Sequence, residues 1–341
     1  MSNKVDLGTV FKGSDSGKIV KAKGITVELK PNEVAIDIAW SGLCGTELHT
    51  CKNGEMVMGH EGVGIVSKIG KDVTQFKVGD RVGWGCNHDS CGHCEECWTG
   101  IDTLCEQRKM YSLTDFHFGS LGDRAALNAD FVHKIPDNLP LKYAAPLQCG
   151  GATVFGGIRR ANVQPLDRVG VVGLGGLGHL AVQFLHKMGC EVVVFSGSNR
   201  KKEEAMKLGA DEFVAVKENP NFEGVKKVKH LICTTSEQPD WNQFFKVLGP
   251  RSKIVPLGVS LGDMTHPYGD ILLKELSIVG SVVAPRQVHK DMLNFAARWD
   301  VRPWIEEMPM TEECINKGME RLEKGDIHYR FVFKSQTTDA E

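Results

Sequence analysis

The amino-acid sequence predicts a two-domain α/β protein in which a β-rich domain is joined to a doubly wound, parallel-sheet domain. The chain has 341 residues, which is more than one ordinary hydrophobic core needs. Short segments rich in β-branched residues and turns occupy its first part. From about Asp167, strand-like and helix-like segments alternate, and this pattern is typical of a parallel sheet covered by helices.

The first domain is predicted from its strands. Glu33 to Trp40 and Gly62 to Ile69 are rich in β-branched residues, and Val78 to Asp80 has the composition of a turn. Near the other end of the chain, a helix from Thr311 to Lys324 and a strand from Tyr329 to Phe333 are expected to return to this domain.

The second domain begins with a buried strand, Val169 to Val172, and a helix, Leu177 to Met188. A second strand from Glu191 to Phe195 precedes a charged helix from Arg200 to Leu208. The alternation then continues, with strands expected at Glu212 to Val216, Lys229 to Cys233, Lys253 to Leu257 and Leu276 to Val279, and a helix at Asp240 to Leu248.

Composition narrows the class of protein. The 41 Lys and Arg residues nearly balance the 43 Asp and Glu residues, so there is no electrostatic reason to expect nucleic acid or an anionic membrane as partner. The longest apolar run, Val169 to Leu185, is interrupted by glycines and a histidine, and the first residues lack the apolar segment of a signal peptide. Eleven cysteines without an export signal favour thiolate ligands in a reducing compartment. We therefore expect a cytoplasmic enzyme that acts on a small molecule.

A glycine-rich stretch predicts a dinucleotide site. Gly173-Leu174-Gly175-Gly176-Leu177-Gly178 matches G-x-G-x-x-G, follows a hydrophobic strand and opens a helix. In that setting backbone N–H groups and the helix N-terminus hold a pyrophosphate, although such a turn can also be purely structural.

The end of the second strand favours NADP over NAD. An NAD site usually has an acidic residue there to bind the ribose 2′-OH. This sequence instead has hydroxyls and cations suited to a 2′-phosphate, unless they only begin a solvated helix capped by Ser198 or Asn199. The candidate contacts are Ser196, Ser198, Asn199, Arg200 and Lys201.

Four closely spaced cysteines predict a structural zinc site. Cys91, Cys94, Cys97 and Cys105 follow the pattern C-x2-C-x2-C-x7-C. Four thiolates suit tetrahedral Zn²⁺ and leave no position open for substrate. The alternative is a set of free, buried thiols. Cys86 and His93 lie nearby in the sequence and are expected to be packing or exposed groups rather than ligands.

With these motifs, the chain resembles the zinc-dependent medium-chain alcohol dehydrogenases, in particular the cinnamyl alcohol dehydrogenase-like branch. The resemblance is carried by SGLCGTELH, GHEGVG, the four-cysteine lobe, APLQCGGATVF, GLGGLGH and ERLEKGDIHYRFVF. It implies a GroES-like catalytic domain over residues 1–148 with the structural zinc lobe at 86–106. A Rossmann NADP-binding domain would span residues 149–284, and residues 285–341 would return to the catalytic domain.

The resemblance also implies a catalytic zinc and a proton path. Cys44, His60 and Cys149 match the three ligands of the family, and Glu61 matches an alternative ligand. Thr46 matches the hydroxyl that contacts the bound alcohol, and His49 matches the histidine that exchanges protons with solvent through the cofactor ribose. Glu47 either orients His60 or is a surface acid of the turn. Further positions expected at the cofactor are Thr46, Thr153, Thr234, Gly258 and Val282.

Two features depart from the family pattern. Gly45 stands where the family often has His or Arg near the pyrophosphate, and the segment between His49 and His60 is several residues shorter than usual. Gly197 also replaces a common serine. Because the short segment borders the substrate cleft in relatives, candidate pocket residues are placed only by analogy and could equally be core residues. They are Trp84, Asn87, Phe116, Phe118 and Trp304.

The expected function is zinc-dependent hydride transfer between NADP(H) and an aldehyde or primary alcohol, with two zinc ions per chain. The favoured direction is reduction of an aromatic or aliphatic aldehyde. A polyol or secondary-alcohol dehydrogenase is the enzymatic alternative, and a zinc- and nucleotide-binding sensor without turnover is the alternative of another class. A zinc-free quinone reductase is disfavoured by the cysteines. Relatives imply a homodimer, or else a homotetramer.

Overall fold

The computed structural model describes residues 3–260, 262–338 and 340, and the chain divides into two compact units. The first unit comprises Met1–Gly150, Pro285–Arg298 and Arg302–Glu341, and the second comprises Gly151–Ala284 and Trp299–Val301. The first unit is therefore built from segments far apart in the sequence.

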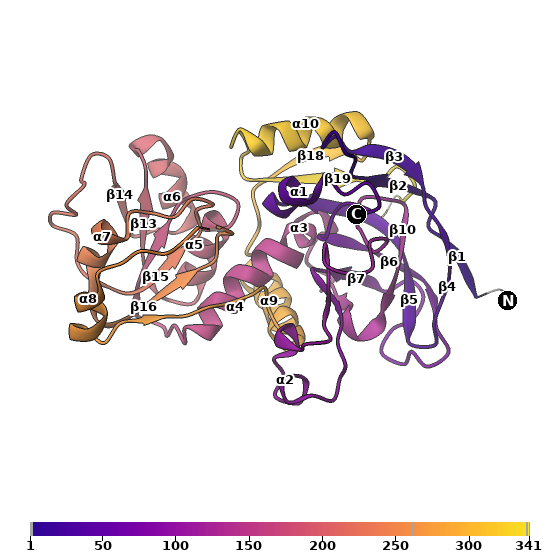
Figure 1. Cartoon of the computed structure of the whole chain (residues 1–341), viewed down its shortest axis with the longest axis horizontal. Helices are drawn as coiled ribbons and strands as arrows, with labels where there is room; N and C mark the ends of the chain where they lie inside the picture. Colours follow the sequence, from indigo (N-terminus) through magenta and orange to yellow (C-terminus); the bar gives the residue numbers. More distant parts are fainter. Residues whose placement is uncertain (1–2, 261, 339, 341) are drawn as a thin grey trace. The chain divides into compact units, whose positions relative to one another are not determined.

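A mixed sheet of seven strands forms the core of the first unit, in the order β11-β7-β6-β5-β19-β18 with β10 also paired to β5 (Figure 1). Its long strand β5 carries fully buried Val34, Ile36 and Ile38, which pack with Phe331 and Phe333 of β19. The strands are β5 (Glu33–Leu43), β6 (Gly62–Ile69), β7 (Arg81–Trp84), β10 (Arg124–Asn128), β11 (His133–Lys134), β18 (Ile305–Pro309) and β19 (Arg330–Lys334).

Short strand pairs and helices complete the first unit. Each pair is antiparallel: β1 (Lys4–Asp6) with β4 (Thr26–Glu28), β2 (Thr9–Lys12) with β3 (Val20–Lys23), and β8 (Asn87–Asp89) with β9 (Lys109–Met110). The helices are α1 (Gly45–Thr50), α2 (Glu95–Trp98), α3 (Leu141–Pro146), α9 (Arg286–Trp299) and α10 (Glu312–Glu323). Single 3₁₀ turns occur at η1 (Asp102–Leu104) and η2 (Ala129–Phe131), and a π-helical turn, η3, spans Leu147–Gly151.

The second unit holds a parallel six-stranded sheet in the order β14-β13-β12-β15-β16-β17. The chain starts in the middle, builds outward to one edge and then to the other, as in doubly wound nucleotide-binding folds. The predicted α/β fold class is therefore confirmed. The strands are β12 (Arg168–Val172), β13 (Glu191–Ser196), β14 (Glu212–Ala215), β15 (Val228–Cys233), β16 (Leu248–Pro256) and β17 (Ser277–Ile278).

One helix expected in the second unit is shorter in the structure. The predicted helix over Asp240–Leu248 is a short helix, α7 (Trp241–Phe244), followed by a 3₁₀ turn, η5 (Phe245–Val247). Leu248 already begins β16, because its pairing with Val228 of the neighbouring strand replaces further helical hydrogen bonds. The other helices are α4 (Ala152–Arg160), α5 (Gly178–Lys187), α6 (Lys202–Leu208) and α8 (Tyr268–Leu273), with the 3₁₀ turn η4 (Asn199–Lys201) before α6.

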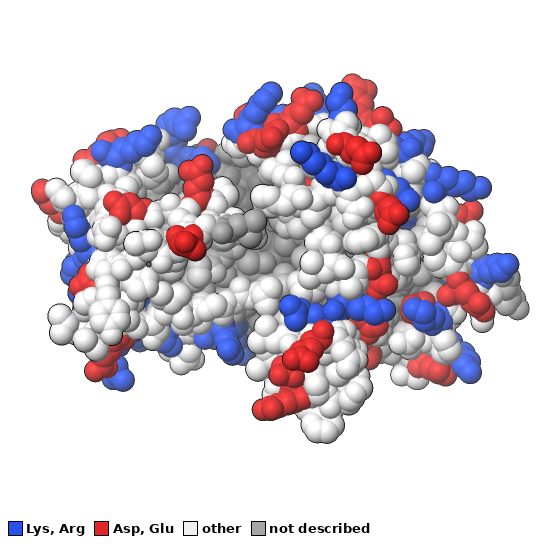
Figure 2. All heavy atoms as spheres, viewed as in Figure 1, with Lys and Arg blue, Asp and Glu red and all other residues white. Residues whose placement is uncertain are grey.

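On the face drawn in Figure 2, basic and acidic side chains are interspersed over both units, in keeping with a net charge of −2. Within the described part of the chain, no helix has the length and apolar character needed to cross a membrane.

Candidate metal centres and cofactor site

Cys44 and His60 are positioned by the same carboxylate. Strand β5 ends at Leu43, and Cys44 begins α1 in an extended conformation. The Cys44 N–H donates to Glu47 Oε2 at 2.9 Å, and Glu47 Oε1 lies 2.6 Å from His60 Nδ1. Because a carboxylate only accepts hydrogen bonds, His60 Nδ1 carries the proton and Nε2 presents a lone pair. Glu47 is fully buried and so is not a surface acid.

Glu61 is held by Arg330, a residue that the sequence did not single out. Both side chains are buried, and Arg330 from β19 forms an ion pair with Glu61 Oε1. A Cβ at Gly42 would overlap Glu61 Oε2, so the glycine admits the carboxylate. Burial raises the pKa of Glu61 to about 8, although Arg330 opposes the shift. The only sequence signal for Arg330 was its place in the terminal HYRFVF stretch.

These residues converge with Cys149 on one point. The donor atoms of Cys44, His60, Glu61 and Cys149 all lie within 4.8 Å of one another, and the two sulfurs are 3.9 Å apart. The contact with Cys149 lowers the pKa of Cys44 well below its ordinary value, while the pKa of Cys149 is raised. Among the described side chains, His60 Nε2 and Glu61 Oε2 are buried without a hydrogen-bond partner. Two thiols, one imidazole lone pair and one carboxylate oxygen are a donor set that suits Zn²⁺.

Three further side chains lie at or near this cluster. The Thr46 hydroxyl is 3.7 Å from Cys44 Sγ, so it reaches the cluster. His49 is exposed on α1, and within the described chain no hydrogen bond joins its ring to Thr46. Cys86 lies against the cluster and not in the four-cysteine lobe: a hydrogen bond from Cys149 lowers the pKa of Cys86 to about 6. Sequence spacing gave no signal for this position of Cys86.

The four cysteines of the lobe form a second cluster. Their sulfurs lie within 4.8 Å of one another, with Cys91 and Cys97 4.0 Å apart. His93 is exposed, with its Nδ1 2.6 Å from the Cys91 carbonyl, and it is not part of the cluster. The lobe is tied to the rest of the first unit by Asp102, whose Oδ1 accepts from the Arg286 N–H at 3.3 Å.

In the second unit, the three glycines that define the G-x-G-x-x-G motif meet three different structural requirements. Gly173 has a φ of +90°, which disfavours other residues. A Cβ at Gly178 would overlap the Gly173 carbonyl, whereas a Cβ at Gly175 would meet no protein atom within 4 Å. The motif therefore leaves open space at its middle glycine, where a pyrophosphate can approach the backbone. The Thr234 hydroxyl stabilises the turn by donating a hydrogen bond to the Val172 carbonyl oxygen at 2.8 Å.

The residues expected at the 2′-phosphate lie beside this turn. Lys201 Nζ donates to Leu174 O at 2.7 Å, and burial lowers the pKa of Lys201. Arg200 Nε lies 3.4 Å from Ser198 Oγ, and Asn199 donates to the carboxylate of Glu218. Glu218 follows β14 and was not foreseen, because nothing in the sequence pairs it with Asn199.

The remaining cofactor candidates lie around the second unit's sheet. Thr153 is half-buried on α4 and Val282 is partly exposed after β17. A Cβ at Gly156 of α4 would overlap the Val283 carbonyl, so α4 and the segment after β17 pack closely. Gly258 is equally constrained, since a Cβ there would overlap Thr235 O.

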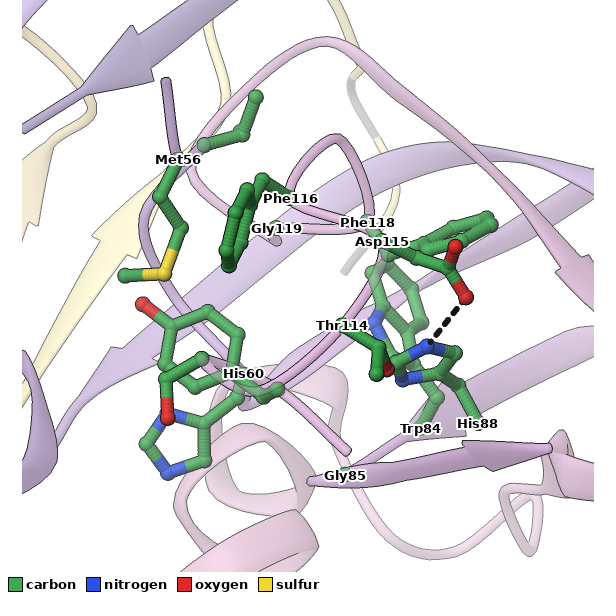
Figure 3. A pocket seen from close by; sticks show the side chains of 13 residues that line it. Met56, His60, Trp84, Gly85, His88, Thr114, Asp115, Phe116, Phe118 and Gly119 are labelled. Atoms are coloured by element: carbon green, nitrogen blue, oxygen red, sulfur yellow. Dashed lines mark hydrogen bonds and ion pairs between the residues drawn. The ribbon is translucent and has the colours of Figure 1, made fainter. Parts of the chain in front are cut away.

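A pocket next to His60 lies entirely within the first unit (Figure 3). Trp84, Phe116 and Phe118 line it as expected, whereas Asn87 and Trp304 are not among its described lining residues. The short segment before His60 supplies Met56 and Val57 to the wall, and the Val57 N–H donates to Phe116 O at 2.7 Å.

One wall of the pocket is polar. In Figure 3 His88 and Asp115 face one another on the side of the view away from His60. His88 Nε2 lies 3.4 Å from Asp115 Oδ2, and Asp115 also pairs with Lys109 at 3.1 Å. Burial lowers the pKa of His88. No sequence pattern indicates that these two residues pair.

Comparisons with known proteins identify the family of the chain. The family described as "Alcohol dehydrogenase GroES-like domain" matches residues 30–137, and "Zinc-binding dehydrogenase" matches residues 176–298. The NADP-dependent alcohol dehydrogenase C 1 of Mycolicibacterium smegmatis is 37% identical over 317 residues, 89% of this chain and 90% of the relative. The probable formaldehyde dehydrogenase AdhA of Bacillus subtilis is 35% identical over 322 residues, 91% of this chain and 92% of the relative. A solved cinnamyl alcohol dehydrogenase of Sorghum bicolor has a TM-score of 0.89 and 32% identity over 98% of each chain.

Proposed function

Because the chain belongs to the zinc-dependent medium-chain alcohol dehydrogenases, we propose that it transfers a hydride between NADP(H) and an aldehyde or primary alcohol. The favoured direction is reduction of an aromatic or aliphatic aldehyde. The observation that carries the proposal is the buried group of Cys44, His60 and Cys149 with an unpartnered imidazole nitrogen. Most buried polar groups have a partner, and one metal ion would satisfy these converging donor atoms together.

In this proposal Cys44, His60 and Cys149 hold the catalytic zinc, with Glu61 as an alternative ligand restrained by Arg330. The structural zinc is held by Cys91, Cys94, Cys97 and Cys105. When bound, zinc supplies Lewis acidity toward a carbonyl oxygen and NADPH supplies the hydride.

The chain's own residues orient the site and move the proton. Glu47 fixes the Nδ1–H tautomer of His60 and the backbone of Cys44, so both donors keep one orientation. The Thr46 hydroxyl, beside Cys44 Sγ, can pass its proton to a nascent alkoxide and be reprotonated. His49 is exposed on α1, so its imidazole can exchange protons with water.

The cofactor proposal rests on the end of β13, where Ser196, Ser198, Arg200 and Lys201 stand without an acidic residue. The test compares NADPH and NADH in initial-rate assays against a panel of aldehydes, ketones and polyols. We expect aldehydes with NADPH to be the preferred pair, and equal rates with NADH would overturn the cofactor assignment. Preference for polyols or ketones would favour the alternative enzyme class.

Lys201→Ala should raise the KM for NADPH about ten-fold or more, because a charge-assisted bond to phosphate is lost. Lys202→Ala, at an exposed position, serves as the control.

We also propose that the enzyme is a homodimer in the cytoplasm. Strand β17 is an edge of the six-stranded sheet, and apolar side chains are exposed on it and on the preceding α8: Tyr268, Leu272, Leu273 and Ile278. A second copy adding its own edge strand would cover them. Light scattering of the wild type and of Leu273→Glu tests this: a dimer that the variant converts to monomer supports it. A wild-type monomer would contradict it, and a tetramer would extend it. The proposed cytoplasmic location is supported by the many cysteines offered as thiolate ligands, which a reducing compartment favours.

A further inference from the structure

A buried polar group lies next to the proposed zinc ligand Cys149, and the steps above do not use it. Gln148 directly precedes Cys149 and is fully buried. Its Nε2 donates to Ala144 O at 3.0 Å, so its Oε1 is left to accept. The donor is Nε2 of His289, 3.0 Å away on α9 and far along the chain.

The backbone around Gln148 has a conformation that needs support. Leu147–Gly151 forms a π-helical turn, a rare geometry that occurs frequently at functional sites. Two glycines beside the turn are forced by the same packing. A Cβ at Gly83 would lie 2.8 Å from the Gln148 side-chain amide, and a Cβ at Gly85 would overlap the Gln148 carbonyl.

The His289 ring is held in one protonation state and one tautomer. Its ring stacks on His133, with centroids 4.1 Å apart and an interplanar angle of 25°. Burial lowers the pKa of His133 to about 4 and that of His289 well below its ordinary value, and the charged neighbours Arg286 and Lys290 also lower the pKa of His133. A neutral His289 that donates through Nε2 must have its other nitrogen unprotonated. The hydrogen bond to Gln148 therefore has one possible direction.

We propose that His289 is a positioning residue for the catalytic zinc: its hydrogen bond to Gln148 orients the π-helical turn so that Cys149 Sγ faces Cys44 and His60. This rests on the proposed function, since it presupposes a zinc ion at Cys149. Outer hydrogen bonds of this kind orient ligands and strengthen metal binding without touching the metal.

The experiment uses His289→Leu, Gln148→Leu and the double variant, with His133→Leu as the matched control that removes the stacked ring but leaves the hydrogen bond. Zinc content per chain is measured first, and then the rate at which each zinc is lost to a chelator. We expect one of the two zinc ions to leave about 10–100-fold faster in His289→Leu and Gln148→Leu, with the other unchanged. The double variant should be no worse than either single variant, because both remove one bond.

Two further readouts separate positioning from mere stability. In the Co²⁺-substituted protein, thiolate-to-metal absorption bands should shift in His289→Leu and Gln148→Leu but not in His133→Leu. His289→Asn, which keeps an N–H donor, should recover part of the zinc retention. If the variants lose thermal stability while zinc loss and cobalt spectra match the wild type, His289 only fills the core and the inference fails. If the wild type binds zinc only at the four cysteines, the proposed function fails as well.

Discussion

At the scale of single residues, Glu47 has the widest effect on the proposed catalytic centre. One carboxylate uses one oxygen for the Cys44 backbone and the other for the His60 ring. Two ligands that come from different elements are thereby fixed relative to one another. A glutamine has only one acceptor oxygen and cannot make both bonds.

We therefore expect Glu47→Gln to weaken zinc binding on the order of 10–100-fold and to reduce kcat, with little change in the KM for NADPH. Chelator competition and initial rates measure the two effects. Glu55→Gln, an exposed acid of the following loop, is the control and should behave as the wild type. Normal zinc retention in Glu47→Gln would show that His60 is oriented by other contacts.

Glu218 is expected to weaken the binding of NADPH. Its carboxylate accepts from Asn199 beside the residues proposed to bind the 2′-phosphate, where a negative charge opposes phosphate binding. Glu218→Gln is expected to lower the KM for NADPH about 2–5-fold, as for an exposed charge interaction. The exposed neighbour Glu223→Gln provides the comparison. A higher KM in Glu218→Gln would mean that Glu218 chiefly holds Asn199 in place.

At the scale of elements, the turn between β12 and α5 contains one glycine that the fold requires and another that cofactor binding is expected to require. Gly178 packs against the Gly173 carbonyl, whereas Gly175 faces open space. Gly175→Ala should fold with an unchanged melting temperature and bind NADPH at least about ten-fold more weakly, because its methyl group occupies the place of the pyrophosphate. Gly178→Ala should instead lower the melting temperature, because α5 must shift away from β12. Equal melting temperatures for the two variants would contradict these roles.

The same scale shows what could be predicted from the sequence. The four-cysteine lobe and the glycine turn were predictable because their residues are close in sequence and their spacing alone defines the geometry. Cys149 was assigned only through a family resemblance, since a lone cysteine carries no spacing signal. Arg330, Glu218, Cys86 and the His88–Asp115 pair were missed because each contact joins residues that only the fold brings together. The helix over Asp240–Leu248 was overestimated because strand pairing at Leu248 outweighs local helix preference.

At the scale of the whole molecule, buried neutral histidines make stability depend on pH. His133 has a folded pKa of about 4, against about 6.5 in an unfolded chain. As the pH falls below 6.5, the unfolded chain binds a proton that the folded chain does not bind until about pH 4. This contribution to stability is fully present above pH 6.5 and is lost as the pH falls through that window.

From pH 7 to pH 5 we expect the free energy of unfolding to fall by about 2 kcal/mol on account of His133. Urea denaturation at the two pH values measures this loss, and His133→Phe should show a correspondingly smaller fall. His186→Gln, at an exposed position on α5, should leave the wild-type fall unchanged. An unchanged fall in His133→Phe would assign the pH dependence to other groups.

The pairing of β5 with β19 has a consequence for biosynthesis. Strand β5 delivers Cys44, yet Leu43 pairs with Phe331, and Arg330 neutralises Glu61. A ribosome exposes all eight proposed zinc ligands and the complete second unit before it adds β19. The ion pair of Glu61 with Arg330 therefore forms only after β19 has been synthesised, whereas the proposed four-cysteine zinc site needs no residue beyond Cys105.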